Sequence, residues 1–151
     1  MKWLTEPLKE LEDYRYLLEN IKNKNTPVLA TGVIDVQKTQ LIYALCKEAG
    51  ATALIIGHDE ADAKSIYNDI LSLNEKASYF PAKDVIFYSA DVHSSDITRQ
   101  RFKTIDELLS GETDFVCTTA EALFERLMPK KEMNEYIFKS FADNRKRTTK
   151  F

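Results

Sequence analysis

A near-match to a phosphate-binding loop lies between Pro27 and Thr39 and constrains the fold more than any other feature. A working loop reads Gly, four residues, then Gly-Lys-Ser/Thr, between a buried strand and a helix, so that backbone N–H groups cradle the phosphates. Gly32, Lys38 and Thr39 match this spacing. The motif therefore predicts a strand–loop–helix unit in which 28–30 is the strand.

Two residues in this segment depart from a working loop. Gln37 stands where the second glycine belongs, and a residue with a Cβ needs roughly 1–2 kcal/mol to adopt the left-handed backbone that glycine adopts freely. Asp35 would place a carboxylate against phosphate oxygens of the same charge. We therefore expect a loop remnant (Gly32, Gln37, Lys38 and Thr39) that binds no cofactor. In this interpretation Lys38 and Thr39 are ordinary residues of a first helical turn; ATP binding is the alternative.

The composition is that of a soluble globular protein. A chain of 151 residues that is 44% hydrophobic and 30% charged is long enough for one domain with a buried core. The net charge of −3 argues against nucleic-acid binding through bulk charge, although a local basic patch is compatible with it. No apolar run approaches the roughly 20 residues of a membrane span, and the N-terminus lacks the apolar core of a signal peptide. We therefore expect a cytoplasmic protein without membrane contact.

The residues that could bind a metal are few and isolated. Cys46, on the apolar side of a predicted helix, and Cys117, in a predicted strand, have no CxxC or CxxH neighbour. Both are expected to be buried free thiols. His58 and His93 likewise stand alone. The sequence therefore predicts no metal site.

Short apolar runs alternate with amphipathic segments, which is the pattern of an α/β protein with a mostly parallel sheet. The run at 52–57 is typical of a strand buried on both faces. Pro81 stops a third run, and Gly111 closes the helix that starts at Ser94. We expect three layers, with helices flanking the sheet. The predicted strands are 28–30, 52–57, 77–81 and 114–119, and the predicted helices are 8–23, 38–49, 59–73, 94–109 and 120–127.

The tetrapeptide Asp59-Glu-Ala-Asp62 has the letters of a helicase motif, but its position does not fit that role. A catalytic carboxylate of that kind directly ends its strand and faces the magnesium ion, whereas Gly57 and His58 intervene here. Acidic residues are favoured at the start of a helix, where they accept from free N–H groups and offset the helix dipole. We therefore expect Asp59 to be an N-cap and Asp62 to lie in the first turn.

A basic cluster on the helix that starts at Ser94 is a candidate partner surface. Its members are Arg99, Arg101 and Lys103. Alternating charges on a helix are otherwise typical of a solvated face, and that alternative stays open.

The chain changes character after Pro129. Residues 136–141 partly alternate between apolar and polar side chains, while residues 144–150 are basic and have no apolar partner positions. We therefore divide the chain into an α/β domain at 1–129 and a segment at 130–151 that is either the start of a further domain or a disordered tail.

The order of these motifs resembles a known family. The quoted stretches are Gly32-Val-(x)4-Lys-Thr39, Leu54-Ile-Ile-Gly-His-Asp-Glu-Ala-Asp-Ala-Lys-Ser-Ile-Tyr67, Tyr79-Phe-Pro-Ala-Lys-Asp84, Arg101 to Leu109, and Phe115-Val-Cys-Thr-Thr-Ala-Glu-Ala-Leu123. Across residues 5–130 this series is similar to the N-terminal domain of the bacterial transcription-repair coupling factor. It is more distantly similar to the first domain of the excision-repair protein UvrB.

The resemblance implies a P-loop, helicase-like fold of the kind found in UvrB domain 1a, without the translocating ATPase, which lies elsewhere in the family's long polypeptide. It implies recruitment of nucleotide excision repair through UvrA, mainly by a small domain inserted after the position of Pro129. RNA polymerase and DNA would bind distant parts of that polypeptide. The chain would then be a truncated piece, with the rest of its own polypeptide as a further partner.

Two departures from UvrB favour the coupling factor. UvrB has an intact P-loop and a long tyrosine-rich hairpin after its third strand, whereas this chain has Gln37 and a short connection from Tyr79 to Asp96. The preferred hypothesis is a non-catalytic module that supports recruitment of repair to stalled RNA polymerase. The alternatives are a nucleotide-binding fragment of an active helicase or UvrB-like ATPase, and a free-standing regulatory domain.

Overall fold

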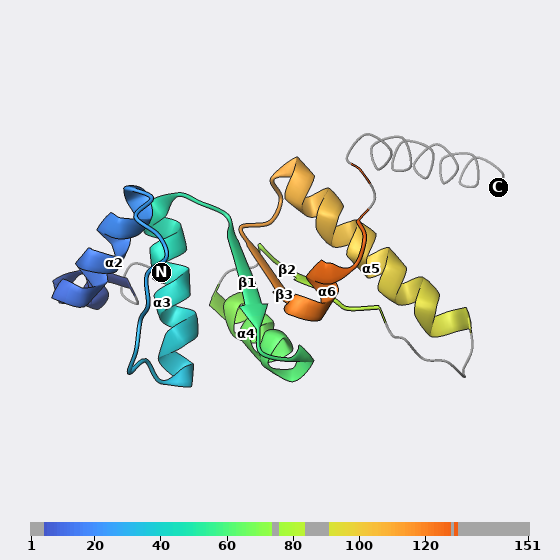
Figure 1. The fold of residues 1–151 in the computed structure, drawn as a ribbon, viewed down its shortest axis with the longest axis horizontal. Helices are drawn as coiled ribbons and strands as arrows, with labels where there is room; N and C mark the ends of the chain where they lie inside the picture. The colour runs from blue at the N-terminus through green and yellow to red at the C-terminus, as the bar shows by residue number, and fades with distance from the viewer. Residues whose placement is uncertain (1–4, 74–75, 84–90, 128, 130–151) are drawn as a thin grey trace.

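The computed structural model describes residues 5–73, 76–83, 91–127 and 129, which form a mixed α/β structure around a small parallel sheet (Figure 1). The strands β1 (Ala53–Gly57), β2 (Ala77–Phe80) and β3 (Phe115–Thr119) lie in the order β1–β3–β2. The helices are the 3-10 helix η1 (Glu6–Glu10) and the α-helices α2 (Glu12–Lys22), α3 (Asp35–Ala49), α4 (Glu60–Leu73), α5 (Asp91–Ser110) and α6 (Ala120–Phe124).

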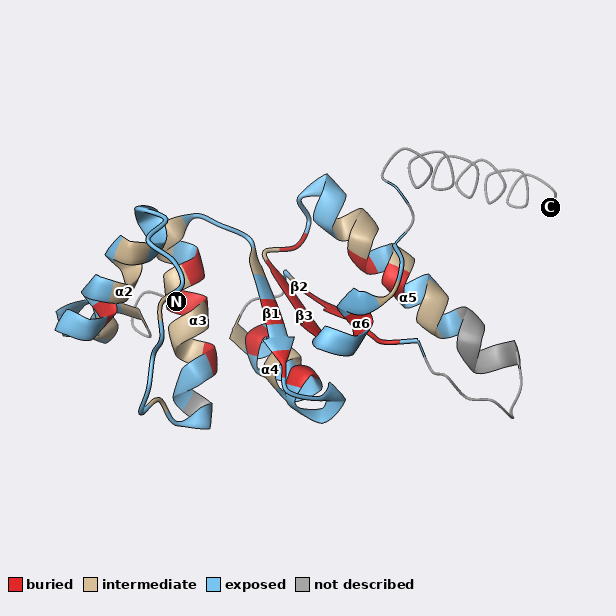
Figure 2. Ribbon diagram, in the orientation of Figure 1, coloured by how far each residue is buried: buried red, intermediate tan, exposed pale blue. Residues whose placement is uncertain are grey.

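The central strand β3 is the most deeply buried element. All five of its residues are buried, and it pairs in parallel with β1 on one side and β2 on the other (Figure 2). Cys117 lies between Ile55 and Tyr79 in this register. Parallel strands covered on both faces are expected to read as continuous runs without charge, and β3 has that composition.

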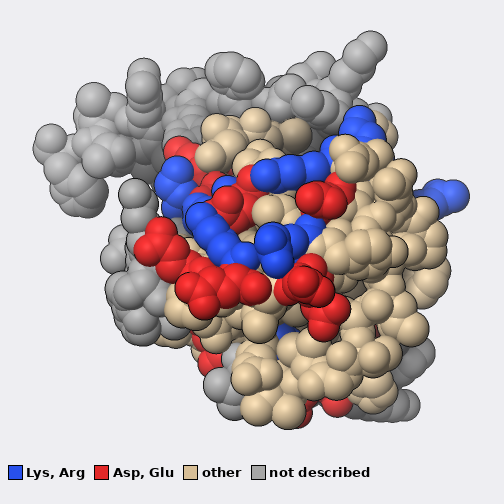
Figure 3. Space-filling view, turned by 90° about the vertical axis from the view of Figure 1, so that its left-hand side faces the viewer, with Lys and Arg blue, Asp and Glu red and all other residues tan. Residues whose placement is uncertain are grey.

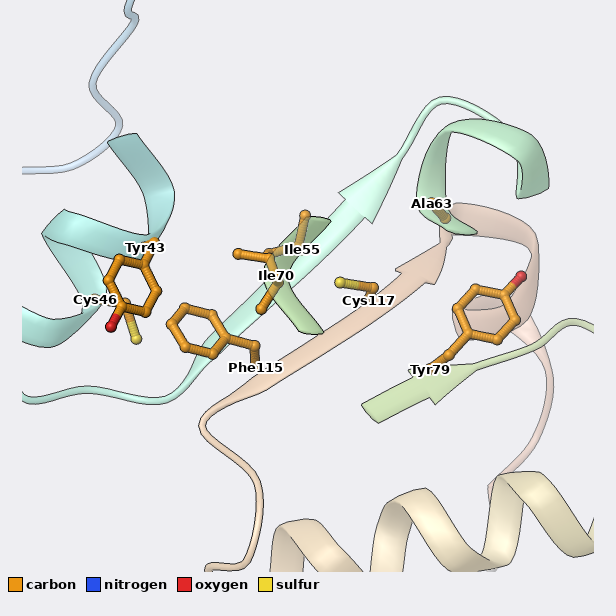
Figure 4. Packing of buried hydrophobic residues seen from close by; sticks show 8 residues of the cluster. All are labelled: Tyr43, Cys46, Ile55, Ala63, Ile70, Tyr79, Phe115 and Cys117. Carbon is orange, nitrogen blue, oxygen red and sulfur yellow. The ribbon is translucent and has the colours of Figure 1, made fainter. Parts of the chain in front are cut away.

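One face of the sheet packs against α4 and receives two side chains from α3 (Figure 4). Ala63 and Ile70 of α4 are fully buried there, and Tyr43 of α3 stacks on Phe115 with ring centroids 5.9 Å apart. Burying such side chains contributes roughly 1.5–3 kcal/mol each, so this cluster dominates the core. Its buried members are Tyr43, Cys46, Ile55, Ala63, Ile70, Tyr79, Phe115 and Cys117.

The opposite face is covered by α5 and α6, over β2 and β3 only. Phe80 and Val116 pack there against Ala122 of α6 and Ile105 of α5. Thr104 of α5 donates a hydrogen bond of 2.9 Å to the carbonyl of Tyr79, which joins the helix to β2. The sheet is thus a middle layer between helices, as the sequence pattern predicts.

Several predicted elements are confirmed, with small shifts at their ends. The predicted strands at 52–57, 77–81 and 114–119 correspond to β1, β2 and β3. The prediction for Gly111 is also correct: it has φ of 73°, and the Glu112 N–H donates to the Glu107 carbonyl (2.8 Å), which satisfies a free carbonyl at the end of α5. The first predicted helix is divided at Leu11 into η1 and α2, and α6 ends at Phe124 rather than near 127.

Two predictions about strands are wrong. Residues 28–30 form no strand: within the part of the chain that the structure describes, no strand pairs with them, and Leu29 is 85% exposed. β1 is buried on one face only, because it lies at the edge of the sheet beyond the reach of α5 and α6. Leu54 and Ile56 are consequently more than half exposed.

The proposed second segment, 130–151, lies outside the described residues, so the division at residue 129 stays a prediction. Among the helices that are described, none is long and apolar enough to cross a membrane.

The end of β1 gives a test of this packing. A Cβ added at Gly57 would lie 2.7 Å from the backbone nitrogen of Ala63 and 2.8 Å from its Cα. We predict that Gly57→Ala lowers the free energy of unfolding by about 1–3 kcal/mol, because the main chain of α4 must shift. Urea denaturation followed by circular dichroism measures the change. Adding Ala63→Gly should not restore stability, since the backbone contacts remain; full restoration would contradict this explanation.

Candidate functional site

The loop remnant lies where an irregular segment, 24–34, meets the start of α3. Gly32 has φ of 77°, in the left-handed region. α3 begins at Asp35, and the N–H groups of Gln37 and Lys38 both donate to the Ile34 carbonyl, at 2.9 and 3.1 Å. The position of the second glycine is therefore inside the first helical turn. Its N–H is used within the helix instead of being directed at an anion.

The lysine of the remnant forms an ion pair with its own helix. Lys38 Nζ lies 2.6 Å from Oδ1 of Asp35, one turn earlier, and both side chains are more than half exposed. The hydrogen bond from Lys38 holds the pKa of the Asp35 carboxyl below its usual value. A phosphate would have to compete with a carboxylate that is already in place, so Lys38 is a poor anion ligand in this arrangement.

The hydroxyl of Thr39, which would hold a magnesium ion in a working loop, points into the protein. Thr39 is 3% exposed, and its hydroxyl donates a long hydrogen bond of 3.5 Å to the carboxylate of Asp69 in α4. The contact joins α3 to α4. The structure thus keeps the four remnant residues adjacent but assigns Lys38 and Thr39 to helix contacts.

A cavity of about 490 Å³ lies beside the remnant, between α2, α3 and the irregular segment. Most of its lining residues are apolar or aromatic, and Asp13 is the charged side chain among them. The lining residues are Leu8, Leu11, Asp13, Tyr14, Tyr16, Leu17, Leu29, Ala30, Thr31, Val33, Gln37, Gln40 and Leu41. A pocket lined in this way offers no cation for a nucleotide phosphate.

The end of the molecule that carries α2 and α3 has charges of both signs. Figure 3 shows a group of basic side chains at the centre of this face, with acidic side chains around and below it. Lys9, for example, pairs with Glu48 at 2.7 Å. Such a surface lacks the positive field that attracts polyanions.

The carboxyl ends of the strands, where ligands bind in open α/β sheets, carry hydroxyl groups that are used in the fold. Thr118 donates to the Phe80 carbonyl (2.8 Å), and the Thr119 side chain accepts from the N–H of Ala122 (3.3 Å), capping α6. The central strand therefore ends without an acidic metal ligand.

The tetrapeptide at 59–62 caps α4, as predicted. Oδ1 of Asp59 accepts from the N–H of Asp62, and Oδ2 of Asp62 accepts from the N–H of His58, both at 2.8 Å. The backbone N–H of Asp62 lowers the pKa of Asp59, with a smaller effect of His58. These carboxylates accept hydrogen bonds from backbone N–H groups at the helix start. The charge of Asp62 also adds a small effect to that of Asp35 in raising the pKa of Lys38.

The two cysteines are buried free thiols. Burial raises the pKa of Cys117 to about 12, which leaves it protonated and inert as a nucleophile. Burial also raises the pKa of Cys46, whose Sγ contacts the Ala51 carbonyl at 2.5 Å. Within the described part of the chain, no three His, Cys, Asp or Glu side chains are close enough to hold a metal ion.

The basic cluster of α5 is not one surface. Arg101 is 5% exposed: its Nη1 donates to the Pro81 carbonyl at 2.6 Å, and its guanidinium lies 4.1 Å from the ring centre of Phe80. Its Nη2 lies 3.2 Å from Oε2 of Glu125. Burial lowers the pKa of Arg101, and the charge of Glu125 partly offsets this. The candidate partner surface is therefore reduced to Arg99 and Lys103, which are exposed.

Comparison with known proteins gives one relative. The chain is 24% identical over 128 residues to the transcription-repair-coupling factor of Bacillus subtilis (strain 168). The chain is distantly related to that protein. The matched region is 83% of this chain but 11% of the relative, so the chain spans about a tenth of its length. No protein-family model matches the chain, and no solved structure is significantly similar to it.

Two ion pairs, which occupy the side chains of Lys38 and Arg101, were not predicted from the sequence. The Asp35–Lys38 pair has a sequence signal, because residues three apart lie on one face of a helix. The Arg101–Glu125 pair has none, because its partners come from α5 and the segment after α6.

Arg101 is buried and Arg99 is exposed on the same helix, so the structural role of Arg101 can be tested with Arg99 as a control. We predict that Arg101→Ala lowers the free energy of unfolding by about 3 kcal/mol, the lower end of the range for breaking a buried pair, because Glu125 keeps some solvent contact. Arg101→Lys should also destabilise the protein, since an ammonium cannot stack on Phe80 while bonding two partners. Urea denaturation measures both. Arg99→Ala is the matched control, and equal losses for the two alanine variants would refute the buried role.

Proposed function

We propose that the chain is a non-catalytic, UvrB-like module of a transcription-repair coupling factor, with a helicase-derived P-loop fold. Its role would be to support recruitment of nucleotide excision repair, through UvrA, to stalled RNA polymerase. The relationship to the Bacillus subtilis coupling factor over 128 residues is the observation that carries this proposal. Contacts with UvrA through a following domain, and with RNA polymerase and DNA through distant parts of the parent protein, belong to the same proposal.

The geometry of the loop remnant supports the non-catalytic half of the proposal. Gln37 is helical, Lys38 is paired with Asp35, and Thr39 is buried against α4. Each would have to change its partners before a nucleotide phosphate and its magnesium ion could bind. The alternative, an active helicase or UvrB-like ATPase fragment, would need those contacts to break on binding.

Nucleotide binding is the direct test of this alternative. We predict that calorimetric titration of the chain with Mg-ATP gives no binding heat at micromolar concentrations, because Lys38 is paired with Asp35, the N–H of Gln37 is bonded within α3, and the Asp35 carboxylate opposes a phosphate. Asp35→Gly with Gln37→Gly removes the opposing carboxylate and the helical side chain, and should be the variant that gains affinity. Saturable binding by the unaltered chain that Lys38→Ala abolishes would overturn the proposal.

The role in repair can be tested in the relative. We predict that residues 1–129, substituted for the matched region of the Bacillus subtilis coupling factor, preserve faster repair of the transcribed strand in cells. The chimera carrying Lys38→Ala should repair at the same rate, because the ion pair of this lysine is with Asp35 of its own helix. A chimera that folds and binds RNA polymerase but loses strand-specific repair would argue against a shared role. If strand-specific repair is lost in the Lys38→Ala chimera but kept in the unaltered chimera, the result would favour the ATPase alternative.

A further inference from the structure

Two segments leave the sheet at the carboxyl ends of the neighbouring strands β2 and β3. Residues 81–83 follow β2, and α6 with residues 125–127 follows β3. In open α/β sheets, the connections at this end are the ones that surround a ligand, so their positions matter for function. A glutamate joins the two segments here: Oε1 of Glu125 accepts a hydrogen bond of 2.7 Å from the backbone N–H of Lys83.

The second oxygen of the same carboxylate faces a buried cation. Oε2 of Glu125 lies 3.2 Å from Nη2 of Arg101, and Nη1 of this arginine donates to the Pro81 carbonyl at 2.6 Å. The guanidinium also lies 4.1 Å from the ring centre of Phe80. Arg101 therefore keeps two contacts at the end of β2 that do not involve Glu125, and the carboxylate is the part of this cluster that comes from the other segment.

Glu125 is the attachment point at the end of α6. This helix has five residues, Ala120–Phe124, and a helix of that length is not stable by itself. Ala122 is fully buried and anchors its start. Among the described residues that follow Ala122, all except Glu125 are exposed, with Phe124 at 90% and Leu127 at 51%. The end of α6 is thus held to the rest of the fold mainly through one carboxylate.

Withdrawal of this carboxylate would leave two groups without a partner. The Lys83 N–H would lose its acceptor, and Arg101, which is 5% exposed, would lose its countercharge in a buried position. Both losses are unfavourable, so the contacts of the two oxygens are expected to form and break together. Coupling between two sites is reciprocal, and a shift of residues 81–83 should therefore loosen the end of α6 as much as the reverse.

We propose that Glu125 is a latch that couples the connection after β2 to the chain that leaves α6, so that displacing either segment releases the other. The latch consists of the Glu125 carboxylate, the Lys83 N–H and the Arg101 guanidinium. Movement of the chain beyond α6 would alter the connection after β2 without any direct contact to it. This proposal is independent of the loop remnant and of the proposed role in repair.

The first test measures amide exchange in the isotopically labelled whole chain, with the Cys117 amide of the central strand as the reference for global unfolding. Glu125→Ala should speed exchange of the Lys83 amide by about tenfold or more relative to this reference, because the amide loses its acceptor. Glu121→Ala, at an exposed glutamate of the same helix, is the matched control and should leave the Lys83 amide within about twofold.

The reverse direction is tested at the donor of the hydrogen bond. Lys83→Pro removes the N–H that Glu125 accepts, whereas Lys83→Ala keeps it and removes only the ammonium group 3.9 Å from Oε2. Lys83→Pro should speed exchange of the α6 amides by about tenfold relative to Cys117, and Lys83→Ala should leave them within about twofold. In the Glu125→Ala background the two substitutions should have equal effects on α6, since the latch is already open.

Three results would overturn the proposal: an unchanged Lys83 amide in Glu125→Ala, equal effects of both Lys83 substitutions on α6 while Glu125 is present, or a difference between them that persists without Glu125. If Lys83→Pro does not fold, Arg101→Met replaces it, because it removes the other partner of the carboxylate. Arg101→Met should speed the α6 amides about tenfold relative to Cys117 in the presence of Glu125, and should add no effect in the Glu125→Ala background. Equal effects in both backgrounds would refute the latch.

Discussion

The pairing of β3 between β1 and β2 is the interaction on which the rest of the structure depends. It brings together β1 and β3, which are separated by two helices in the sequence, and β2 and β3, which are separated by α5. It also creates the two faces against which α4, α5 and α6 pack. Its hydroxyl groups are satisfied at the buried end, since Thr118 bonds to the Phe80 carbonyl and Thr119 caps α6. A strand so enclosed cannot leave polar groups unpaired without a cost of about 1–3 kcal/mol each.

Most of the loop remnant lies outside this core, and Thr39 is its buried member. α3 is held by Tyr43 and Cys46 at the Phe115 end of the sheet, while Asp35, Gln37 and Lys38 near its start are exposed. No packing contact of the described residues keeps the backbone N–H groups and the lysine of this turn available to a phosphate. The exposed lysine is instead paired within its helix, and the buried threonine bonds across to α4. The segment therefore contributes contacts to the scaffold.

Local signals in the sequence predicted well those features that need only a few neighbouring residues. Asp59 and Asp62 cap α4 because acceptors three residues apart reach the free N–H groups of one turn. Gly111 ends α5 because a left-handed residue is required there. Prediction failed where the outcome depends on distant partners: a strand at 28–30 needs a neighbour, and Arg101 could be recognised as buried only once Glu125 and Phe80 are placed around it.

The sequence by itself determined the alternation of strands and helices, the parallel sheet and the departure of the loop from a working phosphate site, because each follows from periodicity or from the chemistry of single residues. Tertiary structure alone decided which strand is central, which face of β1 stays open and which basic residues reach solvent. These depend on the order of strands in the sheet. That order is fixed by contacts between residues far apart in the chain, such as Ile55, Cys117 and Tyr79, which no local pattern encodes.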